Sequence, residues 1–489
     1  MSGPGPDAIG ASEAAGAADA KHQLRRVMGF WDVLLFCIAA VLGPRWIAAA
    51  ARNGPSSISL WVLAAALFFV PTAYIIVELS TRFPEEGGLY VWTKLAFGDF
   101  HGFIAGWTYW IYTFFYFPGL LIASVAMSAY VGGAGFAWLA QDRAFLLGGS
   151  FVMLALAVWL NIIGLQVGKW LQNAGGVGTY VPLLMIVGAA LLLWSRQGSV
   201  THFSWAALSP HWNWDTVNFW PQLAFAFAGL ELVSAMSEEV KNPQRTFPRA
   251  IFASGALIAL MYIAGTVAVL VMLPSETVDP KSGVFQAITE GSAVLRMAAV
   301  GVIAALLVTV GNAGGVGTTV AGVARIPFIV GIDRYMPAAF GKIHPRWKTP
   351  YFSILVQAAV SSVILLLAQI NDNTRGAYQI LVDAATILYF IPFIYMYAAA
   401  IKLYARADRR ENRAAILVPG GRAGICIAGG LGLLVVAVGI VLSFVPPGDT
   451  SSKILFETKL VAGTVLSILL GLVLYYRGAR QRVADRAGR

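Results

Sequence analysis

The sequence predicts an all-α integral membrane protein with 12 transmembrane helices. Of its 489 residues, 58% are hydrophobic and only 12% are charged, and the mean hydropathy is +0.72. Soluble domains carry about 25% charged residues, so this chain has too few to cover itself with a solvated surface. Its apolar residues also come in runs of about 20, the length of a helix that crosses a hydrocarbon layer roughly 30 Å thick. Lipid is therefore the expected solvent.

Twelve apolar segments have the length and composition of transmembrane helices. They lie at residues 28–51, 58–81, 102–131, 143–164, 171–195, 217–237, 249–273, 294–323, 351–370, 376–404, 422–444 and 457–477. Residues 1–24 are rich in Gly, Ala and Ser and have no apolar core, so we expect a disordered N-terminal tail.

The Lys and Arg residues are distributed unevenly along the chain. If the N-terminus is cytoplasmic, 25 of the 34 lie on the cytoplasmic side, 8 lie on the other side, and Arg45 lies within a span. Cytoplasmic loops are enriched in Lys and Arg, so this distribution predicts an even number of spans and two cytoplasmic termini. The net charge of +10 is then explained mainly by the orientation of the chain in the membrane, together with some attraction to anionic lipid. It does not indicate a nucleic-acid partner.

Residues typical of metal sites and of enzyme active sites are sparse. Both cysteines, Cys37 and Cys426, lie in apolar runs and form no metal-ligand spacing, and the five histidines are scattered. The chain has neither an HExxH motif nor a Gly-Lys-Ser/Thr phosphate loop. The sequence therefore predicts no cofactor or metal, and it argues against a membrane enzyme and an ATP-driven pump.

Two spans contain residues that break helices. The first reads LGPRW at residues 42–46, and the sixth reads FAFAGLE at residues 225–231. Irregular backbone at membrane depth persists only where protein or a cavity covers it. Interrupted spans at corresponding positions of two halves indicate a transporter with inverted repeats and a solute site near the midplane. The alternative for the first span is a simple proline kink.

Arg45 and Glu231 are charged residues deep within these two spans. An ionised side chain at that depth costs about 2.5–3.5 kcal/mol on insertion scales, so such residues face a cavity or a partner. We assign both to proton coupling or gating: Glu231 as a protonatable gate, and Arg45 as a cation facing the solute path, where a carboxylate would bind. The alternatives are a structural hydrogen-bonding role for Glu231, and snorkelling or an ion pair, even with Glu231, for Arg45.

A seven-residue repeat links the fifth and eighth spans. NAGGVGT at residues 173–179 recurs at residues 312–318. Small residues four apart allow helices to approach closely, and that packing role is one interpretation. The other is that the small surfaces make room for a moving half of the first span, with Thr318 or Thr319 offering oxygen to a cation.

Taken in order, the motifs resemble those of the amino acid–polyamine–organocation permeases, most closely the branch of the glutamate/GABA antiporters. The resemblance covers residues 24–480. It is carried by ELS at 78–80, FPEEGGLY at 83–90, FG at 97–98, FAGLE at 227–231, EVKNP at 239–243, FPR at 247–249, Arg325 through Asp333-Arg334, His344-Pro345 and Pro350. The ordered combination is specific, although each piece alone is weak.

The resemblance implies a LeuT-type fold, with a 5+5 inverted repeat and two further C-terminal helices. It implies alternating access around a site formed by spans 1, 3, 6, 8 and 10, with a proton-gating role for Glu231. Candidate substrate-binding residues in those spans are Gly43, Pro44, Arg45, Trp46, Ile47, Tyr109, Tyr112, Phe225, Phe227, Ala228, Gly229, Asn312 and Tyr389. The first span departs from the family's Gly-Ser-Gly pattern, because Pro44 lacks an N–H and Arg45 adds a charge.

The resemblance also implies a secondary transporter rather than an enzyme. Its partners would be an amino acid or a related small amine or acid, protons or a counter-substrate, and the lipid of the cell inner (cytoplasmic) membrane. The alternatives are a polyamine or organocation permease and a transporter-like substrate sensor. We expect a cytoplasmic tail at 1–24, the transporter core at 25–405, the last two spans at 406–480 and a cytoplasmic tail at 481–489.

Overall fold

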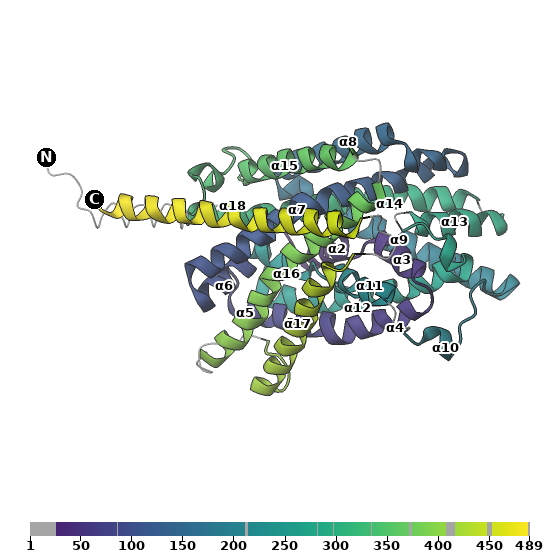
Figure 1. Ribbon diagram of the computed structural model, residues 1–489, viewed down its shortest axis with the longest axis horizontal. Coiled ribbons are helices and arrows are strands. Elements are labelled where there is room, and N and C mark those ends of the chain that lie inside the picture. Colours follow the sequence, from purple (N-terminus) through teal and green to yellow (C-terminus); the bar gives the residue numbers. More distant parts are fainter. Residues whose placement is uncertain are drawn as a thin grey trace.

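The described part of the chain is a bundle of long helices (Figure 1). The computed structural model describes residues 26–85, 87–210, 214–280, 282–296, 298–333, 335–370, 374–406, 416–446 and 452–487. Within these ranges the only β pairing is one isolated bridge, between Met28 and Val240. The predicted N-terminal tail, residues 1–24, lies outside the described residues.

The helices follow the apolar segments of the sequence. They are α2 (Phe30–Val41), α3 (Pro44–Arg52), α4 (Ser56–Ala64), α5 (Val70–Arg82), α6 (Leu89–Phe97), α7 (Asp99–Ser128), α8 (Arg143–Ile163), α9 (Leu165–Gln197), α10 (Trp205–Leu208), α11 (Trp214–Ala226), α12 (Pro243–Met272), α13 (Gly283–Val294), α14 (Ala298–Ile332), α15 (Tyr351–Ile370), α16 (Thr374–Arg406), α17 (Gly421–Ser443) and α18 (Lys453–Ala487). A π-helical turn, η1 (Ala65–Phe69), joins α4 to α5, and the 3-10 helix η4 (Leu230–Glu239) follows α11.

Eleven helical segments within the described ranges are long and apolar enough to cross a membrane, and the apolar stretch Tyr351–Leu367 of α15 is shorter. The predicted class, a multi-pass α-helical membrane protein, is confirmed, while the count of 12 stays a prediction. The first and sixth segments lie deepest: 78% and 89% of their most apolar stretches are buried, against 17% for the last segment. The two interrupted spans are therefore central, and α18 runs along the outside (Figure 1).

The sequence placed some helix boundaries incorrectly. The eighth span was expected at 294–323, but α13 ends at Val294 and α14 begins at Ala298. Arg296 between them has a left-handed backbone, with φ of 57°, which ends the helix inside an apolar run that has no glycine or proline to mark the turn. The expected loop between the second and third spans contains a further helix, α6.

The glycine repeat brings three helices together. A Cβ on Gly175 of α9 would lie 2.6 Å from the Cα of Gly314 in α14, so the two backbones are in direct contact. The next glycine of each copy faces α2: a Cβ on Gly176 would lie 2.6 Å from the Leu35 carbonyl oxygen, and one on Gly315 would lie 3.0 Å from that of Ala39. The packing interpretation of the repeat is confirmed.

Candidate functional site

The first and sixth spans unwind where the sequence predicts it. Between α2 and α3, Leu42 and Gly43 have extended backbones. Between α11 and η4, Gly229 has φ of 129°, a conformation that favours glycine. The two breaks touch, because a Cβ on Gly229 would lie 3.0 Å from Val41 Cγ2. Their freed backbone groups therefore meet in the centre of the bundle.

Tyr262 of α12 holds the two breaks together, and the sequence analysis missed it. Its hydroxyl accepts a hydrogen bond from the Gly43 N–H at 3.2 Å and lies within donating distance of the Val41 carbonyl (2.5 Å) and the Ala226 carbonyl (3.0 Å). Its ring stacks on Trp61, with centroids 4.4 Å apart. The only signal in the sequence was a tyrosine inside an otherwise aliphatic span, which does not reveal its partners.

Replacing Tyr262 by phenylalanine removes this shared hydroxyl. We expect the variant to lose about 1–3 kcal/mol of stability, because buried backbone groups at both breaks lose a partner. The measurement is the melting temperature of the purified protein. Tyr74→Phe is the control, because the structure shows no hydrogen bond of that hydroxyl within the described residues. Equal melting temperatures for the two variants would contradict this role of Tyr262.

Glu231 is buried at the start of η4 and receives three hydrogen bonds. Its Oε1 accepts from the Tyr109 hydroxyl of α7 at 2.8 Å and from the Tyr389 hydroxyl of α16. Its Oε2 accepts from the Gly229 N–H at 3.0 Å. The carboxylate therefore joins spans 3, 6 and 10 through hydrogen bonds and without a cation. The alternative of an ion pair between Glu231 and Arg45 is wrong, because the carboxylate oxygens accept their hydrogen bonds from Tyr109, Tyr389 and the Gly229 N–H.

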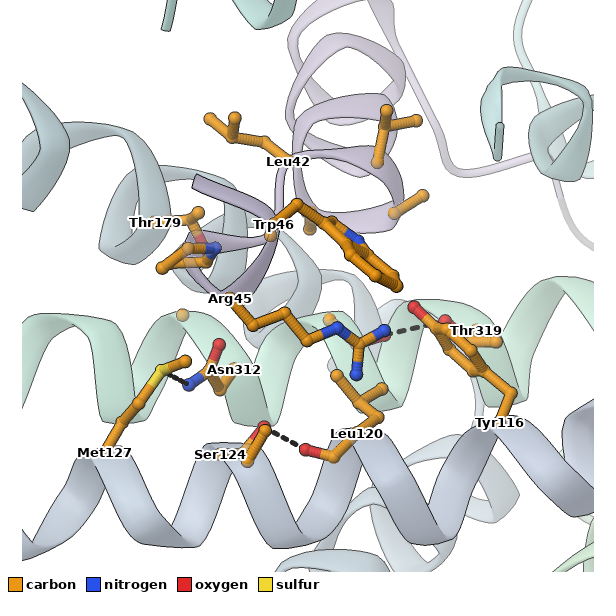
Figure 2. Close-up of a pocket in the computed structure, with 18 residues that line it drawn as sticks. Leu42, Arg45, Trp46, Tyr116, Leu120, Ser124, Met127, Thr179, Asn312 and Thr319 are labelled. Atoms are coloured by element: carbon orange, nitrogen blue, oxygen red, sulfur yellow. Dashed lines mark hydrogen bonds between the residues drawn. The ribbon is translucent and has the colours of Figure 1, made fainter. Parts of the chain in front are cut away.

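Arg45 is also buried, with only 4% of its surface exposed, so the snorkelling interpretation is wrong. Its guanidinium carbon lies 4.5 Å from the ring centroid of Trp46 and 4.9 Å from that of Tyr116. Within the described part of the chain the guanidinium makes no hydrogen bond or ion pair, and its Nε is buried without an acceptor. Figure 2 shows the side chain extending from α3 into the space beside Tyr116 and Leu120.

That space is a cavity between α2, α3, α7, α9 and α14. The residues that line it include Gly43, Pro44, Arg45, Trp46, Tyr116, Ser124, Met127, Thr179, Asn312 and Thr319. It leaves about 30 Å³ for the centres of water molecules, which is room for roughly two waters. The cavity is therefore small, and a solute larger than this requires the walls to move. Ser124, Met127 and Thr179 were not among the predicted site residues.

A second cavity adjoins the first and shares Trp46, Tyr116 and Thr319 with it. Its lining adds five of the predicted residues: Tyr112, Phe225, Ala228, Gly229 and Tyr389. The structure thus brings together residues from spans 1, 3, 6, 8 and 10.

Five predicted residues, Glu231 among them, lie outside the lining of these two cavities. Tyr109 lies behind them at Glu231. The Phe227 ring stacks on Phe69, with centroids 4.5 Å apart, and Ile47 packs against Gly265 of α12. Thr318 is buried and its hydroxyl has no partner in the described residues. Its neighbour Thr319 donates to the Gly315 carbonyl at 3.0 Å.

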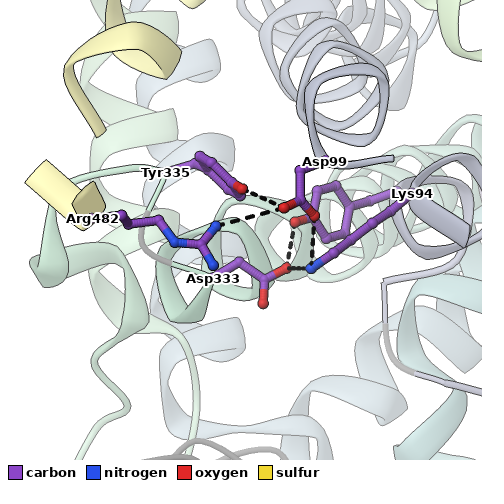
Figure 3. A network of polar contacts seen from close by, with 6 residues as sticks. Lys94, Asp99, Asp333, Tyr335 and Arg482 are labelled. Carbon is purple, nitrogen blue, oxygen red and sulfur yellow. Dashed lines mark hydrogen bonds and ion pairs between the residues drawn. The ribbon is translucent and has the colours of Figure 1, made fainter. Parts of the chain in front are cut away.

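Ion pairs join several helices at one end of the bundle. Arg325 near the end of α14 makes a two-pronged contact with Glu239 of η4, at 2.6 and 3.0 Å, and both side chains are buried. Beside it, Lys94 lies 2.6 Å from Asp333 and 3.5 Å from Asp99 (Figure 3). Tyr335 and Arg482 complete this network through Asp99. The network links α6, α7, α14 and α18, helices whose relative movement would open this end.

Comparison with known proteins identifies the family. Residues 28–467 match the family model described as amino acid permease. An uncharacterized transporter of Legionella pneumophila is 27% identical over 91% of this chain and 96% of its own length. The probable agmatine/putrescine antiporter AguD of Lactococcus lactis is 21% identical over 93% of this chain and 96% of its own. The serine/threonine exchanger SteT of Bacillus subtilis is 23% identical over 79% of this chain and 86% of its own length.

A solved structure supports the fold. MhsT in complex with L-phenylalanine superposes with a TM-score of 0.60 at 12% identity, covering 84% of this chain and 98% of that chain. The LeuT-type architecture that the sequence predicted is confirmed. The matched family and these relatives consist of transporters, so the chain is a secondary transporter and not an enzyme. It is embedded in the membrane as a multi-pass protein, and it belongs to the amino acid permease family.

Proposed function

We propose that this permease moves an amino acid, or a related small amine or acid, across the cytoplasmic membrane by alternating access. The observation that carries the proposal is the contact between two unwound segments, at Leu42-Gly43 and at Gly229, beside two small cavities. Discontinuous helices that meet at depth provide the solute site in transporters built from inverted repeats. The exchanger and antiporter activities named for the relatives support this solute class.

For transport to occur, the cavities must open first to one side of the membrane and then to the other. One end is held by the Glu239–Arg325 pair and the Lys94 network, whose members come from different helices. Opening that end requires these pairs to separate, and closing it requires them to form again. We propose that this alternation moves the solute past Trp46 and Tyr116, which line both cavities.

Two cytoplasmic termini are proposed on the charge distribution and on contacts at the two ends of the described chain. The Val27 N–H donates to the Glu239 carbonyl at 2.9 Å, and Arg482 lies 3.8 Å from Asp99. Both ends of the described chain thus lie at the end of the bundle where the ion pairs join the helices, as an even number of crossings requires. The positive-inside distribution supports placing this end in the cytoplasm.

Transport is tested with the purified protein in liposomes. Serine, threonine, glutamate and putrescine are first screened for stabilisation of the protein, because a ligand that binds the native state raises the melting temperature. Exchange of a radiolabelled hit into preloaded proteoliposomes then measures transport. If no solute of this panel stabilises the protein or exchanges, the proposed solute class is wrong.

Glu231 is the proposed proton-coupling residue. Glu231→Gln keeps oxygen and nitrogen near Tyr109 and Tyr389 but cannot ionise. We expect uptake driven by a pH gradient to fall to the level measured without a gradient, while exchange at equal pH continues. Glu276→Gln, in the exposed loop after α12, is the control and should retain the response. A Glu231→Gln variant with wild-type pH dependence would disprove the assignment.

A further inference from the structure

We propose that Arg45 binds the carboxylate of the transported solute, so that the site takes carboxylate-bearing solutes and rejects amines that lack one. This inference rests on the proposed transport function and specifies its solute class. Its basis is a buried cation with no hydrogen-bond or ion-pair partner in the described residues, placed on the wall of a cavity at the centre of the bundle.

A buried charge without a counter-ion is costly, and the cost is greater at membrane depth. Within the described ranges no carboxylate lines either cavity, and the nearby Glu231 carboxylate already accepts three hydrogen bonds. Among the described residues Arg45 has no counter-ion, and an anion that enters the cavity would supply one. A bound carboxylate supplies that charge together with two acceptor oxygens.

The rings around Arg45 orient its donors. Trp46 and Tyr116 lie 4.5 and 4.9 Å from the guanidinium carbon, at distances typical of cation–π contacts with the guanidinium face. Such contacts use the face of the guanidinium and leave the N–H groups in its plane free to donate. Two of these N–H groups can donate to the two oxygens of one carboxylate. Arg45 is thus held in position and still has donors to offer.

At the first break, the backbone at Gly43 and Pro44 has no free N–H to bind a carboxylate, which leaves the Arg45 side chain to bind it. The Gly43 N–H is engaged by Tyr262, and Pro44 has no N–H. Pro44 also begins α3, whose nine-residue helix directs its N-terminal dipole toward the same cavity. Two of the hydroxyl groups in the lining are also engaged: Ser124 donates to the Leu120 carbonyl and Thr319 to that of Gly315. Arg45 is the charged group left to bind an anion.

The same cavities are less suited to amines that lack a carboxylate. An ammonium group needs acceptors or a carboxylate, and the charged residue in the lining described is a cation. A diamine such as putrescine would place its charge near Arg45 with no compensating anion, and like charges repel. The geometry thus separates this chain from a polyamine permease.

The test uses matched pairs of solutes that differ only in the carboxylate: ornithine with putrescine, arginine with agmatine, and glutamate with γ-aminobutyrate, which keeps one carboxylate. Binding to the purified full-length protein is measured by thermal shift and calorimetry, and exchange is measured in proteoliposomes. We expect at least one carboxylate-bearing solute to bind and exchange, and putrescine and agmatine to do neither. Acetate at high concentration should also stabilise the wild type.

Arg45→Gln should weaken binding of the carboxylate solute by at least about tenfold and abolish stabilisation by acetate, because a charged hydrogen bond is lost. Arg45→Lys, which keeps the charge, should retain part of the affinity and guards against misfolding of the glutamine variant. Arg52→Gln removes a cation from the exposed end of the same helix and should bind normally.

The outcomes separate the two proposals. If Arg45→Gln binds and exchanges amino acids like the wild type, or if the wild type binds putrescine as well as ornithine, the Arg45 assignment is wrong while transport stands. If the wild type exchanges none of these solutes, the proposed function fails and the inference fails with it.

Discussion

Replacing Arg325 by alanine is expected to destabilise the protein by about 3–5 kcal/mol, because it leaves the Glu239 carboxylate buried without its cation. The pair joins η4 to α14 through two contacts of 2.6 and 3.0 Å, and only 2% and 6% of the two side chains is exposed. The loss should appear as a lower melting temperature and a smaller monodisperse fraction in detergent. Because the pair joins helices at one end of the bundle, that end should also become more accessible to thiol reagents at introduced cysteines.

A double variant separates charge burial from lost packing. Replacing Arg325 by methionine and Glu239 by leucine together removes both charges and keeps apolar volume. Such replacements of buried ion pairs are often neutral or stabilising, so most of the lost stability should return. Wild-type stability of Arg325→Ala alone would show that water or another group already neutralises Glu239.

Replacing Gly175 by alanine is expected to cost about 3 kcal/mol, near the upper end of the cost of overpacking. The added methyl carbon would lie 2.6 Å from the Cα of Gly314. A side-chain neighbour could rotate away, but here the obstacle is the backbone of another helix, so α9 and α14 must separate. The yield of folded protein and its melting temperature measure the effect.

Gly188→Ala is the matched control in the same helix. A Cβ at Gly188 meets no described atom within 4 Å, so the substitution adds only helix propensity, worth about 0.8–1.0 kcal/mol in the helix interior. It should leave stability unchanged or raise it slightly. Similar losses for both variants would mean that α9 does not tolerate alanine for a reason other than its contact with α14.

The membrane class, the two broken spans and the presence of small packing surfaces on the fifth and eighth spans could be predicted from the sequence alone, whereas the contact between those two spans could not. The three predictable features follow from local properties of the chain. Runs of about 20 apolar residues require lipid. Gly43 stands directly before Pro44 in the first break and Gly229 lies two residues before Glu231 in the sixth, and such local combinations weaken a helix. Small residues permit close backbone contact between helices. The sequence missed the turn at Arg296 because no glycine or proline marks it.

The tertiary structure decided which side chains satisfy the buried groups. Glu231 takes its hydrogen bonds from Tyr109 and Tyr389, which are 122 and 158 residues away in the chain, and the hydroxyl of Tyr262 reaches Gly43 across 219 residues. Arg45 is left with aromatic rings and no anion among the described residues. Partners at such separations depend on how the helices pack against one another, and the periodicity of a single helix carries no information about that packing.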